Sequence, residues 1–186
     1  MLAQVQLQDW GAARGMLPAL RQALGMDAAG LRQAALLTAE LELAAGQPQA
    51  ALQALSAIAE KADQPSRPLL LLRTQVLLRL GQAQDMAGPL QTWVTLHPQD
   101  AAAWQVLSQV WQAQGQDLRA LRAEAEARAA QYDYAAARDR FRAGQELARR
   151  STTQRSDARA DLIEVSIIDI RLRAMEDLLR EQAAER

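Results

Sequence analysis

Three glycines, Gly46, Gly81 and Gly115, interrupt the chain at nearly equal intervals of 35 and 34 residues. Each lies between two stretches rich in Ala and Leu, which dominate the 49% hydrophobic share, whereas aromatic and β-branched residues are few. Such stretches favour helices over strands. A period of about 34 residues has room for two helices and a tight turn, and units of this kind stack to bury a shared core. We therefore predict an all-α fold of consecutive antiparallel helix pairs.

The third repeating unit carries the residues that point to a family. It resembles a tetratricopeptide repeat (TPR) at four positions, where that family places Trp, Leu, Gly and Ala: Trp104, Leu107, Gly115 and Ala120. Pro98 matches the proline that closes such a repeat. Ser108 stands where the family usually has a small Gly or Ala, and Met86 stands where it usually has Ala. The resemblance implies a TPR-like right-handed α–α solenoid made of degenerate repeats.

The first repeating unit is incomplete at its start. The segment from Asp9 to Ala13 resembles the turn and the early second helix of a repeat. Only about seven residues precede it, which is half of what the first helix of a TPR needs. We therefore expect the chain to begin inside a longer protein, with Met1 as a cloning start or an internal methionine.

Beyond Gly115 the spacing of the repeats changes. The next turn-like segment, Tyr132-Asp133-Tyr134, begins 17 residues later, which leaves room for one helix rather than two. The spacing predicts one helix over 118–130 and its successor over 135–150. The last part of the chain therefore departs from the regular helix pairs.

A polar stretch from Ser151 to Ser156 has the composition of a loop. Asp157 can then cap a last, long helix that runs to about Glu181. These features divide the chain into a degenerate TPR array over 1–131, with a truncated first repeat, and a C-terminal helical extension with a capping helix over 132–186. We expect the extension to be continuous with the array.

No catalytic, metal or cofactor site is predicted. His97 is the only histidine and cysteine is absent, so a two-histidine metal site, an HExxH helix or a thiolate site cannot be assembled. Phosphate-binding glycine motifs are missing, and acidic residues recur beside arginines, as in Arg138-Asp139-Arg140, which is typical of solvated helix faces. His97 precedes Pro98 at the end of a repeat and is interpreted as structural or solvated. We expect this chain not to be an enzyme and to need no cofactor.

The net charge of −1 argues against nucleic-acid binding, which normally requires a basic stripe and a net positive charge. The first residues lack the basic and apolar regions of a signal peptide, and the longest apolar run, Leu69–Leu72, is far too short to span a bilayer. We therefore expect no membrane insertion. The composition leaves the compartment open between periplasm and cytoplasm, and any signal peptide would lie upstream of Met1.

Large aromatic residues recur at helical spacing in the third unit. Trp104 and Trp111 are seven residues apart and share one helical face, while Trp93 lies on the preceding helix. Large residues at such spacing are normally buried. We interpret the tryptophans as core residues rather than as an exposed aromatic platform.

The first helix of each pair builds the inner surface of a TPR array, and its outward positions follow from the register of the matched glycines. These positions form an amide-rich row suited to hydrogen bonding with an extended peptide or a loop backbone: Gln33, Glu40, Gln75, Arg79, Gln105, Gln109 and Gln112. The row lacks the Lys, Asn and Arg set with which some TPR modules clamp a terminal carboxylate. The alternative is a concave face of solvated polar residues that binds nothing.

The last helix is a second candidate surface because its apolar residues cover more than one face. One predicted stripe contains Leu162, Val165, Asp169 and Leu172, and a second contains Ile163, Ile167, Ile170 and Ala174. One stripe can cap the array. The other then needs a neighbouring helix, a second subunit or a missing domain, which makes Ile163, Ile167 and Ile170 candidates for docking or for a homo-oligomer contact.

A second resemblance concerns the last seventy residues, from Arg122 to Glu126, through Tyr132 to Ala137, to Glu164 to Arg173. They resemble the C-terminal TPR region of periplasmic HExxH zinc metalloproteases, the β-barrel assembly-enhancing protease group. The closing Ser-Ile-Ile-Asp-x-Arg-Leu stretch carries most of the resemblance. The zinc ligands and catalytic glutamate of that family have no counterpart in this chain, so no active-site residue carries over.

This resemblance implies a periplasmic docking module that contacts its own protease domain and recruits the outer-membrane assembly machinery or its substrates. In that reading the chain is the regulatory TPR domain of an enzyme for outer-membrane protein quality control. The alternative is a free-standing TPR scaffold or adaptor, periplasmic or cytoplasmic, that assembles a multiprotein complex or a homodimer. Fold alone does not separate the two.

Overall fold

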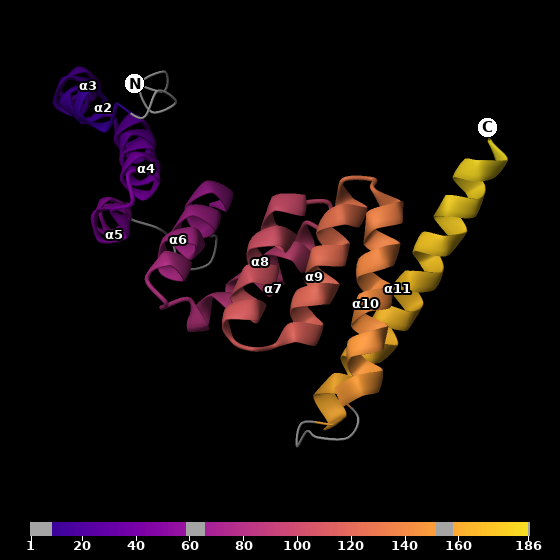
Figure 1. Ribbon diagram of the computed structural model, residues 1–186. Helices are drawn as coiled ribbons and strands as arrows, with labels where there is room; N and C mark the ends of the chain where they lie inside the picture. Colours follow the sequence, from indigo (N-terminus) through magenta and orange to yellow (C-terminus); the bar gives the residue numbers. More distant parts are fainter. Residues whose placement is uncertain (1–8, 59–65, 152–157, 186) are drawn as a thin grey trace. The chain divides into compact units, whose positions relative to one another are not determined.

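The computed structural model describes residues 9–58, 66–151 and 158–185, and every element in these ranges is a helix (Figure 1). The predicted all-α class and the packing of consecutive helices are therefore confirmed for the described residues. The internal contacts of the chain define two compact units, Met1–Ala83 and Gln84–Arg186. The division at residue 131, proposed from the spacing of the turns, stays a prediction.

The first unit contains five helices in its described part: α2 (Trp10–Gly15), α3 (Leu17–Leu24), α4 (Ala28–Ala44), α5 (Pro48–Ser56) and α6 (Arg67–Arg79). Their starts follow local chemistry. The carboxylates of Asp9 and Asp27 accept hydrogen bonds from the first free N–H groups of α2 and α4. Helices α3, α5 and α6 have a proline in their first turn, where its missing N–H costs nothing.

Helix α4 is the centre of the first unit because it is buried on two sides. Leu36 and Ala39 of α4 join a core cluster with Leu55 of α5 and Val76 of α6. Leu41 of α4 belongs to a second cluster with residues of the α2–α3 segment. A helix packed on two sides leaves only narrow strips for solvent or for a partner.

The second unit begins with a short 3-10 helix, η1 (Gln84–Met86), followed by α7 (Ala87–Leu96), α8 (Ala101–Ala113), α9 (Asp117–Ala130), α10 (Tyr134–Ser151) and α11 (Ala158–Ala184). Each helix from α7 onward packs against the next, and α11 contacts α9 as well as α10. The helices predicted over 118–130 and 135–150 correspond to α9 and α10. The predicted cap Asp157 lies outside the described residues, with the rest of 152–157.

The glycines that set the repeat period end their helices in one shared way. Gly46, Gly81 and Gly115 have φ of 73°, 68° and 68°, a left-handed backbone that favours glycine. Each glycine N–H bonds to the carbonyl three residues earlier, and the following N–H bonds to the carbonyl five residues before itself, as Gln47 does to Glu42. This pair of hydrogen bonds is the Schellman motif, which provides donors for the last carbonyl groups of a helix. The regular spacing of the three glycines therefore reflects the same type of turn at the end of three helices.

The tryptophans of the second unit are largely buried, as expected. Trp104 is 7% exposed, and its indole N–H donates to the carbonyl of Pro98 at 2.9 Å. Trp93 is half-buried and donates to the carboxylate of Asp100 at 2.9 Å. His97 is exposed and its ring centroid lies 4.2 Å from that of Trp93, which fits its interpretation as a structural or solvated residue.

Candidate partner-binding site

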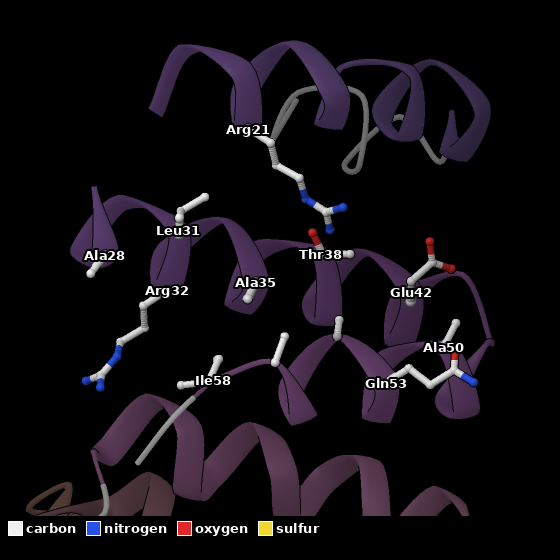
Figure 2. A pocket seen from close by; sticks show the side chains of 12 residues that line it. Arg21, Ala28, Leu31, Arg32, Ala35, Thr38, Glu42, Ala50, Gln53 and Ile58 are labelled. Atoms are coloured by element: carbon white, nitrogen blue, oxygen red, sulfur yellow. The ribbon is translucent and has the colours of Figure 1, made fainter. Parts of the chain in front are cut away.

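A groove of about 740 Å³ lies in the first unit, over α4 and between α3 and α5 (Figure 2). Its floor is one face of α4, formed by residues three or four positions apart: Ala28, Leu31, Arg32, Ala35, Thr38 and Glu42. From Ala28 to Glu42 this floor is about 21 Å long at 1.5 Å per residue. An extended peptide segment of about six residues spans that length.

Small residues keep the groove open along the side of α5. Ala50 and Ala54 line it from α5, and Ala57 and Ile58 line it from the end of that helix. Alanine side chains leave space that larger ones would fill, while Ile58 adds apolar contact area. The amide of Gln53 is exposed on the same side and can donate to and accept from a peptide backbone.

One end of the groove carries a closed ion pair. Arg14 Nε donates to Glu42 Oε1 at 2.8 Å, and Arg14 Nη2 donates to Glu42 Oε2 at 2.7 Å. These hydrogen bonds lower the pKa of Glu42 and raise that of Arg14. The Glu42 side chain is 12% exposed, so the pair is partly shielded from water. The single acidic side chain of the lining is therefore neutralised by a neighbour from α2.

The lining also contains basic side chains. Arg21 and Arg32 are its two arginines, and both are exposed. Figure 2 shows Arg21 extending from α3 toward the turn of α4 that contains Thr38, while Arg32 projects away from Arg21. An arginine beside an apolar floor favours a ligand that pairs a carboxylate with apolar side chains.

The Thr38 hydroxyl donates to the carbonyl of Ala34 at 2.7 Å, so its proton is already engaged within the helix. Across the parts of the chain that the structure describes, no group of three or more His, Cys, Asp or Glu side chains is placed to hold a metal ion. None of the described helices combines the length and apolar character needed to cross a membrane.

The structure leaves every residue of the predicted concave row exposed: Gln33, Glu40, Gln75, Arg79, Gln105, Gln109 and Gln112. Gln33 and Glu40 lie on α4 but not in the lining of the groove, because they are off the face that forms its floor. The first four residues belong to one compact unit and the last three to the other. The row as a binding surface stays a prediction.

The buried face of α11 overlaps the first predicted stripe, through Val165 and Leu172, but does not coincide with it. Ile168, Leu172 and Met175 are buried in a cluster with Phe141 of α10 and Leu118 of α9. Ile168 belongs to neither predicted stripe, because the run of apolar residues from Leu162 to Ile170 is compatible with several faces. The contacts of α9 and α10 select the face centred on Ile168.

The predicted docking residues of α11 lie mostly toward solvent. Ile163 is 59% exposed and Ile170 is 66% exposed, whereas Ile167 is half-buried. Leu162, from the other predicted stripe, is 64% exposed. Exposed apolar residues from both predicted stripes therefore lie outside the core of the second unit, and their role in docking stays a prediction.

Ion pairs hold α11 against α9. Arg171 makes a two-pronged contact with Glu126, at 2.7 Å and 2.6 Å, which raises the pKa of Arg171. Arg122 Nε lies 2.7 Å from Glu164 Oε2, without the alignment of a hydrogen bond. Glu126 and Glu164 are 9% and 8% exposed, so each buried carboxylate has an arginine beside it.

Comparison with models of known protein families and with curated proteins finds no match. The fold therefore defines the class: an all-α protein of packed, consecutive helices. Sequence reasoning missed the groove, although its signal was present. Ala50, Ala54 and Ala57 recur at helical spacing on one side of the groove, and Ala28 and Ala35 lie on its floor, so a run of small residues was the visible signal.

Proposed function

We propose that this protein is a non-catalytic protein–protein interaction module of the TPR type, and that the groove over α4 captures an extended segment of a partner. The observation that carries the proposal is the groove itself, with a floor of mixed apolar and polar residues, an exposed amide and the exposed Arg21. Pockets of this size that combine apolar walls with a few polar groups are the usual form of a binding site.

The favoured ligand is a segment of about six residues with an Asp or Glu beside apolar side chains. Its carboxylate pairs with Arg21, its apolar side chains contact Leu31 and Ile58, and its backbone bonds to the Gln53 amide. The Arg14–Glu42 pair limits the groove at one end. An acidic side chain of the partner at this end would find no cation to pair with, because Arg14 is already bonded to Glu42.

The wider setting of this module is also a proposal. The resemblance of 164–173 to the end of a metalloprotease TPR region supports a periplasmic docking domain that serves outer-membrane protein quality control. The alternative, a scaffold that assembles a complex or a homodimer, is supported by the exposed Ile163 and Ile170 on α11. Reading the gene upstream of Met1 tests the first: an HExxH helix behind a signal peptide supports it, and a different upstream sequence contradicts it.

A charge-reversal experiment tests the groove. Random peptides are selected for binding to the full chain, and the selected peptides are titrated against Arg21→Glu and against Arg73→Glu. Arg73 is exposed on α6 and outside the groove, so its reversal changes the net charge equally. We expect selected peptides to contain Asp or Glu and to bind Arg21→Glu at least about tenfold more weakly, since an ionic hydrogen bond contributes about 1.5 to 3 kcal/mol. Equal weakening by both variants would show only a nonspecific charge effect.

A further inference from the structure

The α2–α3 segment, residues 10–24, forms one wall of the groove and is held to α4 by few buried side chains. Its buried residues are Ala13 and Leu17, which form a small cluster with Leu41 of α4, and Trp10 packs against that cluster. The opposite wall is packed more firmly, because α5 shares with α4 and α6 a cluster of seven buried residues. A segment with few buried apolar contacts opens at a lower free energy than the core beside it.

The turn that joins this wall to α4 has the features of a pivot. Gly25 has φ of 54°, and a Cβ added to it would meet nothing within 4 Å. Met26 is 95% exposed, and Asp27 then caps α4. Rotation of the backbone at Gly25 and Met26 therefore disturbs little packing, as at the hinges of proteins with moving segments. The Leu24 side chain fills the space that Gly30 leaves, but this contact lies close to the pivot.

The Arg14–Glu42 pair lies at the far end of the same wall. Glu42 follows Asp27 by 15 residues of α4, which is about 22 Å at 1.5 Å per residue. Arg14 of α2 donates two hydrogen bonds to its carboxylate, at 2.8 Å and 2.7 Å. A contact far from a pivot resists rotation through a longer arm than a contact beside it. The ion pair is therefore placed to decide how often the wall leaves the floor.

The wall also carries the arginine that the proposed ligand needs. Arg21 belongs to α3, between the pivot and the ion pair, and Figure 2 shows its side chain extending toward the turn of α4 that contains Thr38. The other two side chains assigned to the ligand, Leu31 and Ile58, lie on α4 and at the end of α5. A ligand that contacts Arg21 as well as these two residues bridges the wall and the rest of the groove. Such a ligand favours the closed form over the open one.

We propose that the α2–α3 segment is a hinged wall, which rotates about Gly25 and Met26 and is held closed by the Arg14–Glu42 pair as its latch. Opening admits the partner segment from the side of the groove, and closing brings Arg21 onto it. The role in capture rests on the proposed function of the groove. The hinge and the latch are properties of the free chain and can be measured without a ligand.

Distances between pairs of spin labels, measured by pulsed electron paramagnetic resonance, test the hinge. The chain has no cysteine, so labels attach only where a cysteine is introduced. The test pair, Ala19→Cys with Gln49→Cys, joins α3 to α5, and the control pair, Gln33→Cys with Gln49→Cys, joins α4 to α5; all three positions are exposed. We expect Glu42→Gln to lengthen and broaden the test distances and to leave the control distances unchanged. The ratio of open to closed forms should rise about two- to fivefold, as for the loss of a partly exposed ion pair.

Two further variants separate the latch from a general effect of mutation. Glu40→Gln removes an exposed carboxylate of α4 that lies outside the groove, and it should leave both sets of distances as in the wild type. The charge exchange Arg14→Glu with Glu42→Arg should restore the wild-type distances. Unchanged test distances in Glu42→Gln would overturn the proposal. A charge exchange that leaves these distances as broad as in Glu42→Gln would also overturn it, because lost packing would then explain the opening.

A peptide from the selection described above distinguishes this inference from the proposed function. We expect the peptide to shorten and narrow the test distances of the wild type, and to bind Glu42→Gln up to about fivefold more weakly because the closed form is less populated. If no peptide binds but Glu42→Gln still opens the wall, the proposed function fails and the hinged wall stands. A peptide that binds in the groove while the test distances stay the same in the wild type and in Glu42→Gln would support the proposed function and overturn the hinged wall.

Discussion

Replacing Ile168 by alanine tests how α11 packs on the second unit. Ile168 is fully buried, and a Cβ added to Gly144 of α10 would lie 3.0 Å from its Cδ1. The isoleucine therefore fills the space that the glycine leaves. An Ile→Ala change in a core costs about 2 to 5 kcal/mol. We expect the upper part of this range, about 3 to 5 kcal/mol, because Gly144 has no side chain with which to close the cavity.

Urea unfolding followed by tryptophan fluorescence measures this loss. Three of the four tryptophans, Trp93, Trp104 and Trp111, belong to the second unit, so the signal reports mainly on it. With a slope of about 2 kcal/mol per molar urea, the midpoint should fall by about 1.5 to 2.5 M. The matched control is Ile170→Ala on the same helix, which is 66% exposed and should change stability by no more than about 0.5 kcal/mol.

A second change can recover part of the loss. Gly144→Ala adds a methyl group to the space vacated by Ile168→Ala and improves helix propensity by about 1 kcal/mol. In the wild-type background the same methyl group would press against Ile168, so Gly144→Ala should be less favourable there. Equal losses from Ile168→Ala and Ile170→Ala, or an identical effect of Gly144→Ala in both backgrounds, would refute the assigned register of α11.

Three further predictions follow from the ion pairs and the exposed patch. The hydrogen bonds from Arg14 hold the pKa of Glu42 below its ordinary value of 4.5. The ionised carboxylate therefore contributes fully to the free energy of unfolding above pH 4.5, and this contribution is lost as the pH falls through the lowered pKa. The stability gap between wild type and Glu42→Gln should therefore narrow as the pH falls below 4.5 in urea titrations, and a constant gap would contradict the ionic pairing. Arg171→Ala leaves the buried Glu126 unpaired and should destabilise the chain by about 1 to 3 kcal/mol, whereas Arg173→Ala, an exposed neighbour, should have almost no effect in the same assay. Ile163→Ser with Ile167→Ser should reduce any self-association seen by sedimentation if α11 joins two copies; unchanged association with lower stability would limit these residues to capping.

The helices and their turns were predictable because they depend on local chemistry. Glycines at left-handed turns and alanine-rich stretches between them specify α4, α5, α8 and α9 with no knowledge of distant contacts. Trp104 was recognisable as a core residue from its spacing. These local features determine where the helices and turns lie in the sequence, whichever segments the helices pack against.

The register of α11 and the binding surfaces were not predictable in the same way. Apolar residues occur on several faces of α11, so only the contacts with α9 and α10 select Ile168 over Ile167 or Ile170. The groove over α4 depends on the separation of α3 and α5, which no single segment encodes. Tyr132 could have been noticed as the residue at the C-terminal turn of a predicted helix, but its positive φ became evident only from the backbone.

The most direct test of partner capture is the location of a bound peptide. An acidic peptide selected against the full chain is added to methyl-labelled protein, and methyl signals are followed by NMR. We predict changes at Leu31 and Ile58, which line the groove, and none at the exposed Ile170, which lies in the other unit. Changes confined to α6 and α8, near Gln75 and Gln109, with Leu31 and Ile58 unaffected, would place capture on the predicted amide row and contradict the groove.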